Sequence, residues 1–240
     1  MPALSDRHQD QLRHRAGALT LPLLLWLSVP FAALALAAAR VPLWAAFPQA
    51  GERFALQYVT AAQFAVAALC FPTLVASFRN VFPVLASGWP IALIAGALAA
   101  VPISRACAAE LLVSAFLIVL SLWRQILRST LWQNLAAGIA STWAIGGAML
   151  FYWRTELQIM QARDGVAVSP NLNEALSGPI VAADRIAMDP AFIPHTLWAL
   201  LASLGAAAVI AMVLRKRWGP SRYSESRQSM PKVPPLSPTA

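Results

Sequence analysis

The sequence predicts an all-α membrane protein, a polytopic bundle of about six transmembrane helices with both termini in the cytoplasm. Composition is the first observation behind this prediction. Of the 240 residues, 59% are hydrophobic and only 12% are charged, and the mean hydropathy is +0.61. Soluble domains average about 25% charged residues. The other two observations are the lengths of the apolar stretches and the distribution of charge between them.

The apolar stretches predict where the helices lie. A hydrocarbon core about 30 Å thick requires about 20 mostly apolar residues per helix. Stretches close to this length cover residues 18–39, 54–77, 82–104, 106–123, 131–153 and 195–214. The first stretch also resembles a signal peptide. Its apolar part of about 20 residues exceeds the usual apolar region of about 7–15 residues, so we expect it to be retained as a helix.

The distribution of charged residues predicts the orientation of the chain in the membrane. The chain carries 18 basic and 10 acidic residues. Most basic residues lie in the N-terminal segment, in two short loops and in the C-terminal tail, whereas most acidic residues lie in the alternate loops. The positive-inside rule then places both termini in the cytoplasm. We expect a multi-pass protein of the cell inner membrane.

Three regions follow from this threading. They are a cytoplasmic N-terminal segment (1–17), a six-helix transmembrane domain (18–214) with an outer loop (154–194), and a disordered basic cytoplasmic tail (215–240). The tail is rich in Pro and Ser and has little to bury. In the outer loop we expect two short helical turns broken at Ser177, Gly178 and Pro179, because Gly and Pro interrupt helices.

Arg105 and Glu110 are the first candidates for a functional site, since ionisable residues within a membrane are costly and usually functional. Arg105 falls in the predicted tight turn between the third and fourth helices, and Glu110 falls about one turn inside the fourth. An arginine that reaches water near a glutamate at a helix N-terminus explains the pair without chemistry. We therefore expect Glu110 to lie at the water-exposed end of its helix, as a weak candidate for a substrate path.

His195 is the second candidate. It is the histidine that lies next to a predicted membrane helix, and the chain has 3 histidines in all. Haem or a metal ion in a helix bundle requires two or more ligands at matching depth, which the other histidines do not supply. We expect no cofactor and no metal, with His195 forming hydrogen bonds at the membrane surface.

The short loops predicted on the cytoplasmic side contain Arg79, Arg124 and Arg128. These residues are candidates for docking a cytoplasmic partner. The positive-inside rule alone also accounts for them.

Small residues recur four positions apart in three of the predicted helices, a spacing that lets membrane helices pack closely. The sets are Ala92, Gly96 and Ala100; Gly138, Thr142 and Gly146; and Ser203, Ala207 and Ala211.

Two functional hypotheses remain open. The first is a permease-like subunit of a transport complex, because the helix number and the broken helical segment before the last span resemble the layout of small ABC-type exporter permeases, including haem-exporter-like subunits. That resemblance covers the layout and no motif, and it implies an ATPase partner beside the lipid bilayer. The second is a non-catalytic membrane anchor or assembly factor of a respiratory or secretion complex, using the outer loop as its interaction surface.

Polar residues discriminate between the hypotheses. Inward-facing polar side chains favour transport, whereas a dry bundle favours the assembly factor. The predicted spans are poor in such residues apart from Gln57, Gln63, Asn134 and scattered Ser and Thr.

A third hypothesis, a membrane enzyme, is disfavoured, because it needs two or more ionisable groups at one depth and only Arg105 with Glu110 comes near this. Catalytic motifs such as HExxH, the P-loop and GxGxxG are also absent from the sequence, so we expect no enzyme. The charges lie between apolar stretches and are explained by topology, so we expect no nucleic-acid binding either.

Overall fold

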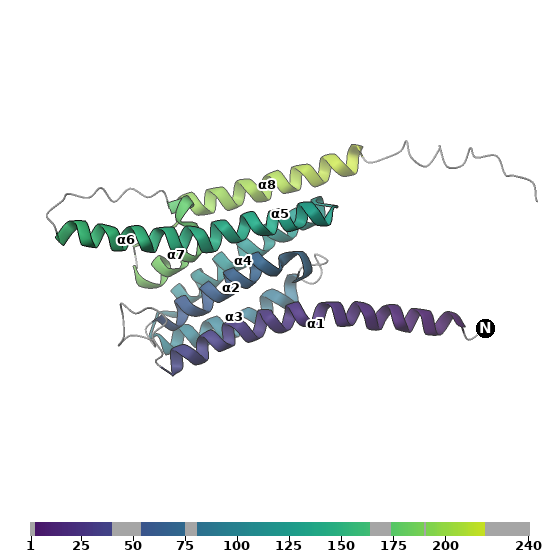
Figure 1. The fold of residues 1–240 in the computed structure, drawn as a ribbon, viewed down its shortest axis with the longest axis horizontal. Coiled ribbons are helices and arrows are strands. Elements are labelled where there is room, and N and C mark those ends of the chain that lie inside the picture. Colours follow the sequence, from purple (N-terminus) through teal and green to yellow (C-terminus); the bar gives the residue numbers. More distant parts are fainter. Residues whose placement is uncertain (1–2, 40–53, 75–80, 164–173, 190, 219–240) are drawn as a thin grey trace, which may run out of the picture.

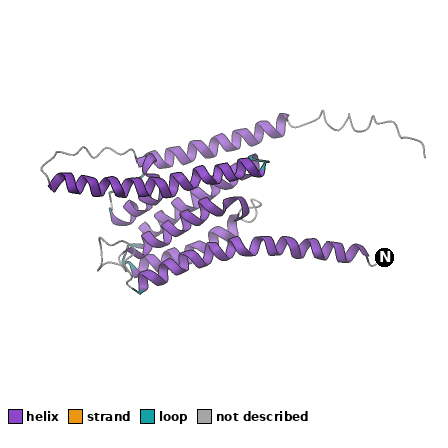
Figure 2. Ribbon diagram, viewed as in Figure 1, coloured by secondary structure: helices purple, strands orange, loops and turns teal. Residues whose placement is uncertain are grey.

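The computed structural model describes residues 3–39, 54–74, 81–163, 174–189 and 191–218. These residues fold into helices, with no strand among them (Figures 1 and 2). The helices are α1 (Ala3–Ala38), α2 (Ala55–Leu74), α3 (Val81–Leu98), α4 (Ile103–Ile126), α5 (Thr130–Ser141), the π-helical turn η3 (Thr142–Gly146), α6 (Gly147–Arg163), α7 (Glu174–Met188) and α8 (His195–Trp218).

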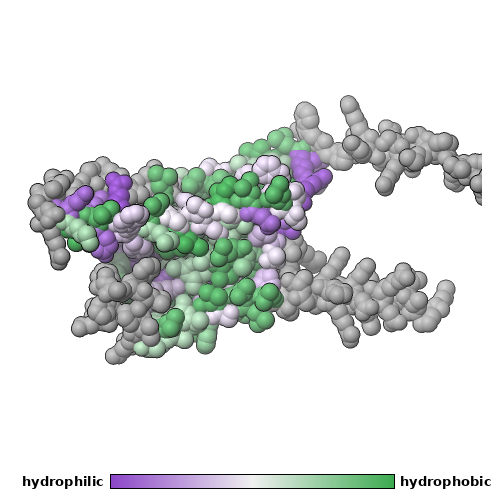
Figure 3. Space-filling view, in the orientation of Figure 1, coloured by the Kyte–Doolittle hydropathy of each residue, from purple (hydrophilic) through white to green (hydrophobic). Residues whose placement is uncertain are grey.

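Among the described residues, six helical segments are long and apolar enough to cross a membrane, as predicted. They are Leu21–Ala38, Ala55–Leu74, Val81–Leu98, Ile103–Ile126, Thr130–Gln161 and His195–Lys216. Apolar residues cover the middle of the face seen in Figure 3, and hydrophilic residues lie toward both ends. Large apolar side chains such as Leu135, Ile139 and Ile210 are exposed, which suits a surface that faces lipid. The structure therefore has the features of a multi-pass membrane protein.

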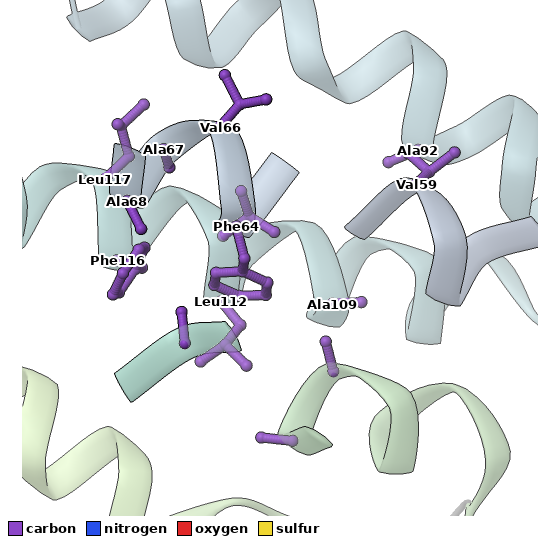
Figure 4. Packing of buried hydrophobic residues seen from close by; sticks show 14 of the residues in the cluster. Val59, Phe64, Val66, Ala67, Ala68, Ala92, Ala109, Leu112, Phe116 and Leu117 are labelled. Atoms are coloured by element: carbon purple, nitrogen blue, oxygen red, sulfur yellow. The ribbon is translucent and has the colours of Figure 1, made fainter. Parts of the chain in front are cut away.

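Helices α2 and α4 form the centre of the bundle. Of the residues in each span, 67% are buried in α2 and 56% in α4, against 17% in α8. Helix α2 packs against α1, α3, α4, α5 and α7, and in Figure 1 α2 and α4 lie between α1 and α3 on one side and α5, α6 and α8 on the other. Their contact is largely aromatic and aliphatic (Figure 4): the rings of Phe64 and Phe116 meet edge to face, 5.4 Å between centroids.

The turn between α3 and α4 differs from the prediction. Helix α3 ends at Leu98 and not near residue 104, because Ala100 adopts a left-handed conformation with φ of 55°. The Val101 N–H then donates to Gly96 O at 2.9 Å and the Ala100 N–H to Ala97 O at 3.1 Å, which is the Schellman closure of a helix. Because the chain turns early, α4 begins at Ile103 and has 24 residues.

Helix α7 is broken where the sequence predicted a break. Gly178 has φ of 83°, a conformation that L side chains rarely adopt. A Cβ there would lie 2.5 Å from Trp143 O of η3, and a Cβ on Gly147 would lie 2.9 Å from Leu176 O. The two glycines therefore let the backbone of α7 rest directly on η3 and on the start of α6.

The segment predicted as an outer loop is largely helical and partly buried. Helix α6 continues to Arg163, and α7 packs against α2, α4, α6 and α8. Val181, Ala182, Ala183 and Ile186 are buried. Helix α7 is thus part of the bundle, whereas most residues of α6 from Arg154 to Gln161 are exposed. We call the end of the bundle where α7 lies the α7 end.

Three predictions fall on residues outside the described ones. These are the loop around Arg79 (75–80), part of the outer loop (164–173) and most of the C-terminal tail (219–240). The first residues of the predicted tail, 215–218, belong to α8.

Candidate functional site: a buried polar line on α2 and α4

Glu110 is fully buried, with 0% of its surface exposed. The expectation of a water-exposed helix end was wrong for this residue. Because α4 begins at Ile103, Glu110 lies seven residues further along, about 10 Å down the helix axis. Its face of α4 also packs against α2 and α3, which removes it from the surface.

Four helices meet at Glu110. Gln63 Nε2 of α2 lies 3.4 Å from Glu110 Oε1 and 3.4 Å from Gly88 O of α3, and donates to both. Trp26 Nε1 of α1 donates to Val84 O at 2.9 Å. We call Trp26, Gln63, Gly88 and Glu110 the Glu110 cluster.

Gly88 makes room for this cluster. A Cβ at position 88 would lie 2.9 Å from Gln63 Nε2, 3.0 Å from Glu110 Oε1 and 3.2 Å from Trp26 Cζ2. Real Cβ atoms essentially never show the first of these distances, and the other two are tighter than nine in ten real Cβ contacts. Glycine therefore allows the carboxylate, the amide and the indole to meet at one point of the bundle.

Several polar atoms at this point have no hydrogen-bond partner among the described residues. They are Glu110 Oε2, Gln63 Oε1 and the Oγ of Ser114, which follows Glu110 by one helical turn. Leaving such an atom buried costs about 1–3 kcal/mol. Natural proteins retain few such groups, and those retained call for a specific explanation.

The buried polar side chains of the described chain gather on the two central helices. They are Gln57, Thr60 and Gln63 on α2, and Glu110, Ser114 and Ser121 on α4. The α4 residues follow at steps of four and seven, so they lie on one side of their helix. The α2 residues are three positions apart, so their stripe turns by about 120° around the helix from Gln57 to Gln63. We call these six residues the polar line. The other buried polar residues described are Gln133 and Ser177.

A second carboxyl adjoins the polar line at the α7 end. Tyr152 of α6 donates its hydroxyl to Asp184 Oδ2 of α7 at 2.7 Å. Gln57 lies close enough to lower the pKa of Asp184, although neither of its amide atoms forms a hydrogen bond within 3.5 Å. Burial raises the pKa of Asp184, and this outweighs the lowering by Tyr152, Gln57 and the Arg185 charge. We call Gln57, Tyr152 and Asp184 the Asp184 site.

Arg185 is held beside this site by aromatic rings. Its guanidinium carbon lies 5.1 Å from the ring centre of Phe151 and 5.4 Å from that of Phe192. Through these cation–π contacts the Arg185 guanidinium stays near the Asp184 carboxylate but lies against the two rings.

Arg105 and Glu110 do not form a pair. Five residues on a helix place two side chains about 140° apart, and Arg105 NH1 instead donates to Ala187 O of α7 at 3.4 Å. Arg105 thus joins the start of α4 to the end of α7.

Two further arginines bind helix C-termini in the same way. Arg124 Nε donates to Pro72 O of α2 at 3.0 Å. Arg215 NH1 donates to Gln125 O and Ile126 O of α4, at 2.8 and 3.1 Å. The last carbonyls of a helix lack partners within the helix, so a cation satisfies them and the helix dipole together.

The remaining candidates lie at the surface. Arg128 and His195 are exposed, and His195 is the first residue of α8. The described residues hold no group of three His, Cys, Asp or Glu side chains placed to bind a metal ion. Of the small-residue sets, the first packs α3 on α4, where a Cβ on Gly96 would lie 2.7 Å from Ala106 Cβ, while Gly138 has open space around it.

The sequence reasoning missed Gly88, Tyr152, Asp184 and the inward direction of both glutamines. The spacing of Gln57, Thr60 and Gln63 within an apolar span was the available signal, because three polar residues on adjacent turns form a stripe. The predicted span 131–153 holds two more amides: Gln133 is buried and donates to Leu127 O at 2.6 Å, whereas Asn134 is exposed.

Comparisons with protein-family models, with curated proteins and with solved structures find no match for this chain. Its function must therefore be inferred from its own residues.

Proposed function

We propose that this chain is a permease-like transport subunit of the cell inner membrane, with both termini cytoplasmic and the α7 end facing outward. The observation that carries the proposal is the buried polar line centred on Glu110 and Gln63. A bundle that acts only as an anchor gains little stability from burying a carboxyl and two amides, because buried ionisable groups are often replaced by apolar residues of similar volume without loss. Buried polar groups in membrane helices are characteristic of substrate and ion pathways.

The chemistry of the Glu110 cluster favours a cation or a neutral hydrogen-bonding solute. A carboxylate oxygen and an amide oxygen are left as acceptors. The cluster itself contains no basic side chain to hold an anion. We infer that an anionic substrate would be excluded from this point.

The cytoplasmic side offers a docking position for a partner. Arg124 is occupied by the carbonyl of Pro72, whereas Arg128 is exposed in the turn between α4 and α5. An ATPase or another cytoplasmic subunit that contacts Arg128 fits an exporter-type complex.

A comparison of cells tests the proposal even while the substrate is unidentified. We would compare small molecules inside cells and in the medium for strains that carry no protein, the unaltered protein, Glu110→Gln or Glu156→Gln. Glu156 is an exposed carboxyl on α6 and serves as the matched control. Transport through the polar line predicts that Glu110→Gln reproduces the imbalance of the deletion strain at an unchanged protein level.

Co-purification decides between the two functional hypotheses. The chain tagged after Ala240 would be purified in mild detergent with its partners, and these identified by mass spectrometry. A stoichiometric ATPase supports the permease subunit. Respiratory or secretion subunits, together with normal solute levels in Glu110→Gln cells, would replace it with the assembly factor.

A further inference from the structure

We propose that the polar line carries protons between the α7 end and Glu110, with Asp184 as the carboxyl at which they enter or leave. This inference rests on the proposed function and names its coupling ion. Three features support it: the placement of Asp184, the polar groups along α2, and the positions of the surrounding charges.

The position of Asp184 suits a carboxyl at which protons enter the path. It is half-buried on α7, the helix that packs on α2 and α4 at this end of the bundle. The Tyr152 hydroxyl holds one carboxyl oxygen in place at 2.7 Å. Because burial raises the pKa of Asp184, the carboxyl takes up a proton at a higher pH than an exposed aspartate does.

Helix α2 connects the two carboxyls. Gln57 adjoins Asp184 and Gln63 adjoins Glu110, and the two glutamines are six residues apart, about 9 Å along the helix. Thr60 lies between them, and its hydroxyl donates to Leu56 O at 2.9 Å, which leaves its oxygen able to accept a hydrogen bond. Each turn of α2 between the carboxyls therefore presents a buried polar group.

Several buried polar atoms along this path are free to form hydrogen bonds. Both amide atoms of Gln57, Oε1 of Gln63 and Oε2 of Glu110 are buried without a hydrogen bond. The proposed path requires water molecules at these groups, and a buried water typically makes two to four hydrogen bonds in a polar interior. A proton taken from the outer solvent by the Asp184 carboxylate passes along these waters and ends on the Glu110 carboxylate, leaving Asp184 ionised again.

Two arginines lie near the proposed proton path, and both are bound to groups outside it. Arg185 lies over the rings of Phe151 and Phe192, and Arg105 is bound to Ala187 O. Tyr152 is the other titratable group in contact with Asp184. At Glu110 the contacting groups are the Gln63 amide and, across the space at Gly88, the Trp26 ring.

A divalent metal ion fits the Glu110 cluster less well than a proton. Calcium takes about six to eight oxygen ligands and magnesium requires an octahedron. Among the described side chains the Glu110 cluster offers only the oxygens of Glu110 and Gln63. A proton needs one acceptor oxygen and a hydrogen-bonded route, which these residues supply.

The test follows the protonation of Glu110 in time. The full chain in lipid nanodiscs would receive a rapid pH drop while infrared absorption of protonated carboxyl groups is recorded, with the Glu110 signal assigned as the part lost in Glu110→Gln. We expect Asp184→Asn to slow this signal by at least tenfold without changing its final amplitude. Asp189→Asn removes an exposed carboxyl at the end of the same helix and should leave the rate unchanged.

Chemical rescue separates a relay from a structural role. A small weak acid such as formic acid, added to Asp184→Asn protein, should restore the rate because it delivers protons in place of the missing carboxyl. Gln57→Leu interrupts the path without removing a charge and should slow the signal as well. An unchanged rate in both variants, or a slowed rate that no weak acid restores, would overturn the proposal.

The two experiments separate a failure of the proton path from a failure of the transport function. Slowed and rescued protonation with normal cellular solute levels in Glu110→Gln cells would keep the proton path and remove transport. Altered solute levels with an unchanged protonation rate would keep transport and remove the proton path.

Discussion

Glu110 shows how a single carboxyl can be accommodated in an apolar bundle. Its oxygen Oε1 has one neutral donor, Gln63 Nε2, at the long distance of 3.4 Å. Because Gly88 has no side chain, it leaves room for the carboxyl but offers it no further polar side chain. This arrangement satisfies the carboxyl only in part, so a proton or a ligand stabilises it further.

Gly88→Ala tests whether that space matters. The added Cβ would meet the amide of Gln63 and the carboxyl of Glu110, which are movable side-chain ends, so we expect a loss of about 1–2 kcal/mol in unfolding free energy and the loss of function. Gly138→Ala is the control, because a Cβ there meets nothing within 4 Å and alanine favours a helix by up to about 1 kcal/mol. Thermal unfolding in detergent measures both, and equal effects would contradict the packing account.

Asp184 makes stability depend on pH. Its pKa is raised in the folded protein, so the folded state holds this proton more firmly than the unfolded state. Stability should therefore fall as pH rises from the ordinary aspartate pKa, about 3.9, through the raised one, and then level off. In Asp184→Asn this contribution disappears. A melting-temperature difference between the two proteins that stays constant with pH would refute the assignment.

Helix ends in this bundle are joined by arginines. Arg105, Arg124 and Arg215 each donate to a carbonyl in the last turn of another helix. Positive charge at a helix C-terminus is favourable by about 0.3–1 kcal/mol, and the hydrogen bond adds to it. The three arginines thus connect α4 to α7, α2 to α4 and α4 to α8.

The two arginines of the α4–α5 region should behave differently. Arg124→Met leaves the carbonyl of Pro72 without its donor, and we expect a loss of about 1–2 kcal/mol in unfolding free energy. Arg128→Met alters an exposed residue and should change stability by less than about 0.5 kcal/mol. Denaturation in detergent measures both variants. If Arg128→Met proves the more damaging to stability, the roles assigned to the two arginines are wrong.

The whole molecule has buried polar side chains at its centre and an apolar exterior. Helices α2 and α4 carry the polar line, and the helices around them expose apolar side chains. Side chains that lipid would exclude are in this way hidden from it. Under the proposed transport function, a polar solute would travel along the bundle axis, beside the polar line.

The orientation of the chain in the membrane can be tested with reporters fused to its two sides. With six spans, the chain ends should lie on one side, and the positive-inside rule makes that side the cytoplasm. A fluorescent reporter that matures only in the cytoplasm should be active after Ala240. Alkaline phosphatase, which works only outside, should be active when fused after Arg163. The opposite pair of results would mean that the α7 end faces the cytoplasm, so that protons would enter the polar line from the cytoplasmic side.

Much of the fold was predictable because long apolar stretches must form helices in lipid, where backbone groups have no water to bind. The break at Gly178 was predictable for a local reason, since glycine tolerates positive φ and Pro179 follows it. The end of α3 was not, because Ala100 adopts a left-handed conformation that alanine usually avoids. The depth of Glu110 along α4 depended on that end, because α4 begins at Ile103 and not near residue 106.

The sequence by itself determined the six spans, the break in α7 and the charge pattern that predicts orientation, because these depend on length, composition and local conformation. Only the tertiary structure decided that Gln57, Gln63 and Glu110 face inward together, that Asp184 adjoins them, and that Arg105 binds α7 and not Glu110. The physical reason is that a polar residue in an apolar span can face lipid, a partner or the interior. Which of these occurs is settled by how neighbouring helices pack.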